Sequence, residues 1–183
     1  MDPDSRQECA QSIGIASADR KNPALLEHVK PGSPDMTVSY AWNGYEEEYL
    51  RRGRELTLPI GTVMPTLDRP AGVIDSKSGE CIDPYYYQGG LGQNDADSNG
   101  YCLWEGFWLD AARRDNVEDM NRGLEAMRAF QQTWTWENAW DVSVHDYLTE
   151  SWSKAALGDG SMLATNFELA CAQVHDQFVG WDD

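Results

Sequence analysis

An apolar residue recurs at every third or fourth position through the second half of the chain, which is the spacing of amphipathic helices. Four segments show this spacing, and they span 101–114, 116–134, 143–158 and 161–178. Asn116 and Ser143 stand at the start of two of them, where helix N-caps are favoured. The pattern therefore predicts a bundle of about four α-helices over 101–179.

The first hundred residues differ, because proline and glycine interrupt them too often for long elements. Residues 1–35 contain four prolines and predict an extended N-terminal arm. Residues 36–100 predict a short helix over 45–53 that ends at Gly53, one or two brief strands within 55–65, and otherwise a long layer of ordered loops. We expect a mainly α fold.

Length and charge narrow the class of protein. A chain of 183 residues suits a single domain over 1–183, and 41% hydrophobic residues with eight Trp and eight Tyr supply a core. Fourteen basic against 31 acidic residues give a net charge of −17, which would repel nucleic acids and anionic membranes. The sequence has no run of 18 apolar residues, so we expect a chain that does not span a membrane as given.

The four cysteines are far apart and lack the C-x-x-C spacing or neighbouring histidines of a zinc site. They predict two disulfides, with four buried thiols in a cytosolic protein as the alternative. Cys102 and Cys171 both adjoin apolar stripes, so we favour Cys102–Cys171, which leaves Cys9–Cys81; Cys81 with Cys102 is the closest competitor. Disulfides imply a secreted or extracytoplasmic protein. This expectation includes a protein that is tethered to a membrane by a segment missing from this chain.

The stretch NDADSNGYCLWE, residues 94–105, is spaced like the first half of an EF-hand calcium loop. The matching residues are Asp95, Asp97, Asn99 and Gly100. The twelfth loop position, which should hold a bidentate acid, is Gly106. The preferred interpretation is that a polar residue within 97–99 caps a helix that begins near residue 101. Calcium is kept as an alternative, and no other cofactor is expected.

Two groups of aromatic residues are candidates for binding a partner. Tyr85, Tyr86 and Tyr87 precede the glycine-rich GGLG, and Trp136 and Trp140 form a second group. Rigid amphipathic rings suit protein recognition or stacking on sugars, although packing against a core is their commoner role. These residues predict contact with a protein or a cell-envelope polymer, and the sequence leaves the oligomeric state open.

No standard catalytic motif occurs in the chain. A glycosidase or peptidase using two carboxylates needs little sequence signal, and Glu105 and Asp110, which flank Trp108, are the candidate pair. A secreted hydrolase acting on a polysaccharide or peptide is therefore an alternative function.

The order of residues in YYYQGGLGQNDADSNGYCLW, 85–104, resembles a pattern in uncharacterised secreted or membrane-tethered proteins of actinobacteria. The resemblance implies an extracytoplasmic location and no particular activity. We therefore expect a non-enzymatic binding or adaptor module that uses its aromatic loops, with the hydrolase and a calcium-stabilised structural module as alternatives.

Overall fold

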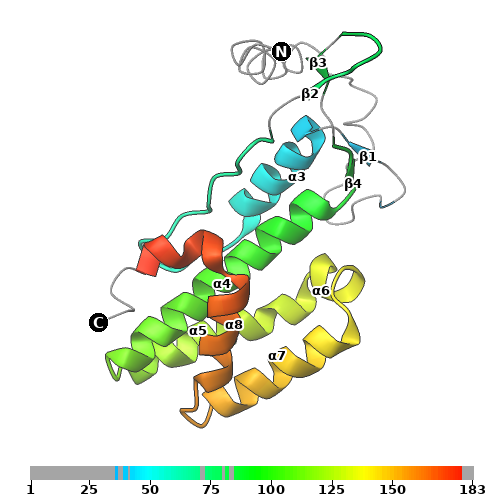
Figure 1. Ribbon diagram of the computed structural model, residues 1–183. Helices are drawn as coiled ribbons and strands as arrows, with labels where there is room; N and C mark the ends of the chain where they lie inside the picture. Colours follow the sequence, from blue (N-terminus) through cyan, green and yellow to red (C-terminus); the bar gives the residue numbers. More distant parts are fainter. Residues whose placement is uncertain are drawn as a thin grey trace. The chain divides into compact units, whose positions relative to one another are not determined.

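The computed structural model describes residues 36, 39–40, 42–70, 73–79, 81–82 and 85–178. The predicted arm over 1–35 and the Cys9–Cys81 disulfide lie outside the described residues. The described chain is mainly α-helical, as predicted (Figure 1). It divides into two compact units, 1–51 with 66–93 and 52–65 with 94–183, which are described separately below. The prediction of a single domain stays a prediction.

The described part of the first unit contains four strands of two residues each and the beginnings of two helices. Strand β1 (Ser39–Tyr40) pairs antiparallel with β4 (Tyr87–Gln88), and β2 (Val73–Ile74) pairs antiparallel with β3 (Cys81–Ile82). Helix α3 (Trp42–Glu55) and helix α4 (Leu91–Arg113) both start here. The strands expected within 55–65 do not form, and the described strands lie elsewhere.

The glycine-rich stretch at the start of α4 allows two backbones to pack closely. A Cβ atom on Gly92 would lie 2.2 Å from the backbone oxygen of Tyr45, so only glycine lets these backbones approach. Gly90 has a φ of +92°, and its N–H donates to the buried carboxylate of Glu48 at 2.9 Å. Burial raises the pKa of Glu48, while backbone N–H groups at the start of α4 act in the opposite direction.

The second unit is built around α4. Every residue from 101 to 109 is buried, so this part of the helix is covered on all sides rather than along one stripe. Helices α5 (Val117–Ala129), α7 (Val142–Ala155) and α8 (Ser161–Ala170) supply its neighbours in one apolar core. Shorter pieces are η1 (Phe130–Gln132), α6 (Trp134–Asn138) and η2 (Ala172–Phe178).

Several helix boundaries differ from those expected. Asn116 caps α5 as predicted, accepting the N–H of Asp119 at 3.1 Å. Helix α7 is capped by Asp141, which accepts the N–H of Ser143, so Ser143 lies inside the helix. Gly53 likewise lies within α3 rather than after it. The predicted helix over 161–178 is divided at Cys171, where η2 follows α8.

The largest correction concerns 91–100, which were expected to be loop and are the first turns of α4. The cap expected within 97–99 is therefore wrong. Asp97 lies in the helix interior and is fully buried, with Arg52 Nε 2.7 Å from its Oδ1. Long-range pairing thus keeps an acid in a helical position that its local preference disfavours. No helix of the described residues has both the length and the apolar character to cross a bilayer.

Candidate functional site: a pocket beside a buried carboxyl group

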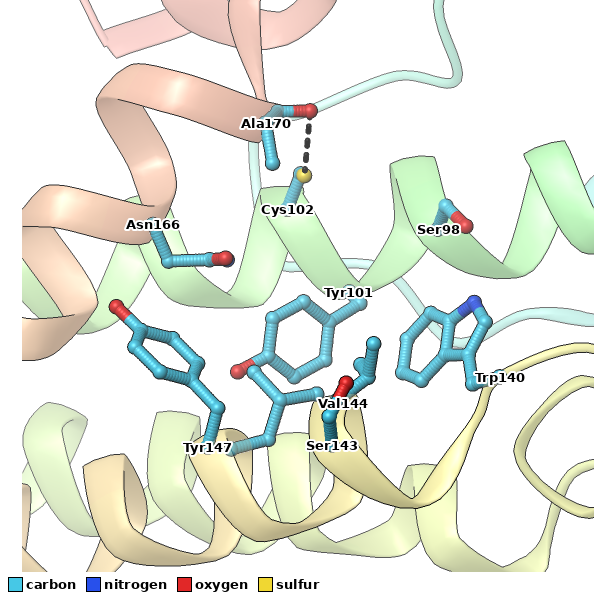
Figure 2. Close-up of a pocket in the computed structure, with 10 residues that line it drawn as sticks. Ser98, Tyr101, Cys102, Trp140, Ser143, Val144, Tyr147, Asn166 and Ala170 are labelled. Carbon is cyan, nitrogen blue, oxygen red and sulfur yellow. Dashed lines mark hydrogen bonds between the residues drawn. The ribbon is translucent and has the colours of Figure 1, made fainter.

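A cavity of about 550 Å³ opens among α4, α7 and α8 of the second unit (Figure 2). This volume is within the usual range for small-molecule sites. The residues that line it are Ser98, Tyr101, Cys102, Trp140, Ser143, Val144, Tyr147, Leu148, Asn166 and Ala170. None of them is an acid, a lysine, an arginine or a histidine. The wall is therefore aromatic and aliphatic, with a few neutral polar groups.

Hydrogen bonds fix the two tyrosine rings of this wall. The hydroxyl of Tyr101 accepts the indole N–H of Trp152 at 3.1 Å. The hydroxyl of Tyr147 donates to the backbone oxygen of Met162 at 2.9 Å, which joins α7 to α8. Tyr101 is buried and only Tyr147 is partly exposed, so the rings form an inner and an outer wall.

Glu105 lies one helical turn after Tyr101 and is fully buried. The amide Nδ2 of Asn166, which lines the pocket, donates to Glu105 Oε2 at 2.8 Å, and the Tyr101 hydroxyl lies 3.5 Å from Oε1. Burial raises the pKa of Glu105 to about 8, although these two hydrogen bonds lower it. The carboxyl group therefore carries its proton at neutral pH.

A disulfide joins Cys102 on α4 to Cys171 at the end of α8. Only Cys102 lines the pocket, and Cys171 has no exposed surface. Cys171 Sγ lies 3.5 Å from Glu105 Oε2, and Cys102 Sγ lies 3.8 Å from the oxygen of Ala170 (Figure 2). These are close contacts of sulfur atoms that carry no hydrogen. One sulfur thus faces the cavity and the other faces the acid.

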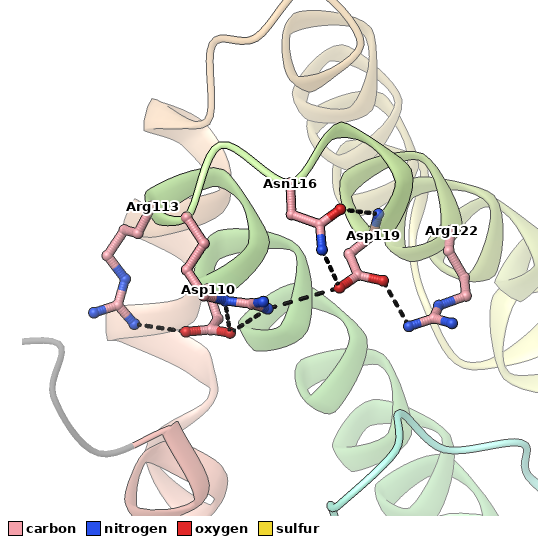
Figure 3. Close-up of polar contacts among 6 residues, drawn as sticks. Asp110, Arg113, Asn116, Asp119 and Arg122 are labelled. Carbon is pink, nitrogen blue, oxygen red and sulfur yellow. Dashed lines mark hydrogen bonds and ion pairs between the residues drawn. The ribbon is translucent and has the colours of Figure 1, made fainter.

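Glu105 and Asp110, the pair suggested for a hydrolase, are not brought together. Asp110 is partly exposed and makes ion pairs with Arg113 at 3.5 Å and Arg114 at 2.7 Å (Figure 3). Glu105 has an entirely different set of contacts, all of them buried or beside the pocket. The two carboxyl groups therefore do not share a cleft.

The residues suggested for calcium are likewise engaged in a helix. Asp95, Asp97 and Asn99 lie on α4, whose backbone cannot wrap an ion as an EF-hand loop does. The carboxylate of Asp97 accepts bonds from Arg52 and from the Thr135 hydroxyl at 2.5 Å. The EF-hand geometry is therefore wrong, while calcium binding as such stays untested.

The aromatic candidates divide between exposed rings and packed ones. Tyr85 and Tyr86 are 53% and 82% exposed, whereas Tyr87 stacks on Tyr45 with ring centroids 4.6 Å apart. All three candidate tyrosines belong to the first unit, and their role in binding a partner stays a prediction.

The two tryptophan candidates belong to the second unit. Trp136 stacks on His145 at 4.0 Å and on Trp152 at 5.6 Å, so it serves the core. Trp140 lines the pocket and meets Tyr101 edge to face at 6.0 Å. Of the two, Trp140 is the one placed to touch a ligand.

The pocket residues that sequence reasoning missed include Tyr101, Tyr147 and Asn166. A signal existed for the first, because Tyr101 and Glu105 are four residues apart in an otherwise apolar helical segment. No comparable signal marks Asn166, whose partner is 61 residues away. Comparison with protein-family models, with curated proteins and with solved structures finds no match to this chain.

Proposed function

We propose that this protein is an extracytoplasmic binding module that holds an uncharged, ring-bearing small molecule in the pocket among α4, α7 and α8. The observation that carries the proposal is a cavity of about 550 Å³ whose lining has no side chain that is charged at neutral pH, beside an acid that is itself protonated at neutral pH. A charged ligand would lose its hydration there without gaining an opposite charge.

The lining also favours rings over chains. Trp140 and Tyr147 offer aromatic faces at the partly exposed side of the cavity, and Val144 adds an aliphatic contact (Figure 2). The Asn166 amide points toward the cavity, and its Nδ2 already donates to Glu105, so its oxygen is the group available to accept a hydrogen bond from a ligand. A planar apolar ring with a hydroxyl or amino donor fits this set of groups.

The compartment is part of the same proposal. The Cys102–Cys171 disulfide supports an oxidising, extracytoplasmic location, where such bonds persist. A protein or a cell-envelope polymer remains the partner suggested for the exposed Tyr85 and Tyr86. The pocket and these tyrosines are separate candidate contacts, and the geometry favours the pocket because it is concave.

The test is titration of the folded chain with N-phenyl-1-naphthylamine, an uncharged aromatic dye whose fluorescence rises in apolar surroundings. We expect saturable binding of one dye per chain. Ala170→Trp places an indole in the pocket and should weaken binding at least tenfold. Leu169→Trp is the matched control, because Leu169 is the neighbouring residue on α8, is 82% exposed and does not line the cavity.

Near-ultraviolet circular dichroism and the denaturation midpoint establish that each variant is folded before the titration. Equal dye affinity in the wild type and in folded Ala170→Trp would mean that the dye does not enter this cavity, and the proposed function would be rejected. Weakened binding by both tryptophan variants would also contradict it, because Leu169 lies outside the lining.

A further inference from the structure

We propose that the Cys102–Cys171 disulfide is a thiol–disulfide exchange site, in which a thiol that enters the pocket attacks Cys102 and Glu105 supplies the proton to the departing Cys171. This is a chemical reactivity and goes beyond the binding of an uncharged ligand. It rests on the placement of three groups: a sulfur that lines a cavity, a second sulfur that does not, and a carboxyl group against the second.

The two sulfurs differ in access. Cys102 is a lining residue of the pocket with 4% of its surface exposed, whereas Cys171 is outside the lining and has no exposed surface. A neutral thiol that enters the cavity therefore meets Cys102 rather than Cys171, and it attacks as its sulfur gives up its proton to water. Because exchange proceeds by attack on one sulfur with the other as leaving group, Cys171 must be the leaving group.

The leaving sulfur needs a proton because a thiolate in this apolar site would be poorly solvated. Glu105 Oε2 is 3.5 Å from Cys171 Sγ, which places the acid beside the atom that gains the charge. Within the described chain, neither sulfur has a hydrogen-bond contact with a lysine, arginine or histidine that could stabilise the thiolate instead. The raised pKa of Glu105 keeps a proton available at neutral pH.

Asn166 has a positioning role in this arrangement. Its Nδ2 donates to the same oxygen, Oε2, that faces Cys171. This bond fixes the carboxyl group between the pocket wall and the disulfide. It also lowers the pKa of Glu105 and so keeps the acid able to release its proton near neutral pH.

The reaction with a dithiol balances as follows in atoms and electrons. One thiolate of the dithiol bonds to Cys102 Sγ, the Cys102–Cys171 bond breaks, and the Glu105 proton moves to Cys171. The second thiolate of the dithiol then attacks its partner sulfur in the mixed disulfide and releases Cys102. The dithiol is oxidised to a cyclic disulfide, both cysteines are reduced, and the two protons lost by the dithiol restore Glu105 and protonate Cys102.

A purely structural disulfide would behave differently. The cysteines are 69 residues apart, and closing such a loop stabilises a fold by limiting the freedom of the unfolded chain, with or without a neighbouring acid. Its reduction in the folded state would not depend on Glu105. The dependence on the acid therefore separates the two roles.

The experiment measures the rate at which dithiothreitol reduces this disulfide in the folded full-length chain at pH 7, by alkylation and mass spectrometry of the Cys102 and Cys171 peptides. We expect a rate proportional to dithiothreitol concentration and at least tenfold slower in Glu105→Gln. Glu168→Gln is the matched control, because Glu168 is an exposed acid on α8, and it should react like the wild type. Asn166→Ala should give an intermediate rate.

Folding of Glu105→Gln is verified by its denaturation midpoint at pH 5, and the rates are followed from pH 6 to pH 9. Equal rates in the wild type and Glu105→Gln would overturn the proposal. So would a rate that is independent of dithiothreitol and equals the rate of global unfolding, since the disulfide would then be a structural link only. Dye binding tests the proposed function separately, so either result can fail without the other.

Discussion

Two carboxyl groups on α4, Asp97 and Glu105, are both completely buried, yet their surroundings differ in kind. Asp97 contacts the guanidinium of Arg52 at 2.7 Å and the hydroxyl of Thr135. Glu105 contacts an amide, a phenol and a disulfide sulfur, and no cation among the residues that the structure describes. Burial raises the pKa of both groups, but at Asp97 a cation acts against it, and at Glu105 the pKa reaches about 8.

These different surroundings indicate a structural role for Asp97 and a carboxyl group that can take part in chemistry for Glu105. Asp97 joins α4 to α3 and α6 through charge-assisted hydrogen bonds, and neither of its side-chain partners, Arg52 and Thr135, lines the pocket. Glu105 keeps its proton, lies beside a cavity and touches a sulfur of the disulfide. Buried groups with perturbed pKa values beside a cavity are candidates for function, whereas a satisfied ion pair is the usual sign of structure.

The largest expected difference between the two acids lies in how the free energy of unfolding depends on pH. The pKa of Glu105 is about 8 in the folded state and 4.5 ordinarily, so its contribution is fully present below pH 4.5 and is lost as the pH rises through about 8. The difference corresponds to up to roughly 5 kcal/mol. Glu105→Gln should lack this loss, and urea unfolding of both proteins at pH 4.5 and pH 9 measures it. If the difference in free energy of unfolding between the wild type and Glu105→Gln were the same at both pH values, the raised pKa of Glu105 would be refuted.

Asp97→Asn is expected to have the next largest effect. Removing the charge leaves the partly buried Arg52 without its closest partner, and breaking such pairs costs about 3 kcal/mol at pH 7. Glu105→Gln under the same conditions should not destabilise the fold. The comparison would fail if the two substitutions lowered the denaturation midpoint equally.

Thr135→Val tests the second contact of Asp97. The hydroxyl donates to a charged oxygen in a fully buried position, so its loss should lower the free energy of unfolding by about 2 kcal/mol. Thr165→Val is the control, because Thr165 is exposed and bonds only the backbone oxygen of Ser161. Similar losses for both variants would show that the Asp97 cluster is not specially dependent on this bond.

Asp110→Asn should have the smallest effect. Its ion pairs with Arg113 and Arg114 are exposed, and pairs of this kind contribute at most about 1 kcal/mol and are weakened by salt. A loss comparable with that of Asp97→Asn, measured by the same urea titration, would mean that exposure does not separate the acids as described.

Local patterns explain how much of the fold was predictable. The apolar spacing over 116–134 and 143–158, and the cap at Asn116, act within a few residues, and the corresponding helices are present. The start of α4 was missed because its causes are distant: Gly92 is selected by the backbone at Tyr45, and Asp97 by Arg52. The local conformational preferences of these residues alone predict a turn.

The candidate site was predictable only in part. Glu105 was selected because it is an acid among tryptophans, and the pairing of Cys102 with Cys171 followed from two apolar stripes. Asp110, the partner suggested for Glu105, lies at the surface in ion pairs, whereas Glu105 contacts Tyr101, Asn166 and the disulfide. Contacts across 61 and 66 residues leave no mark in a single sequence.

The most direct test of the protonated acid is carbon-13 NMR of the chain labelled at the glutamate side-chain carboxyl carbon. The resonance absent from Glu105→Gln identifies Glu105, and its chemical shift is followed from pH 4 to pH 10. We predict that this signal titrates near pH 8 in the folded protein, in which Tyr101 and Asn166 are hydrogen-bonded to the carboxyl group. A midpoint below about 6, close to that of an ordinary glutamate, would contradict the account.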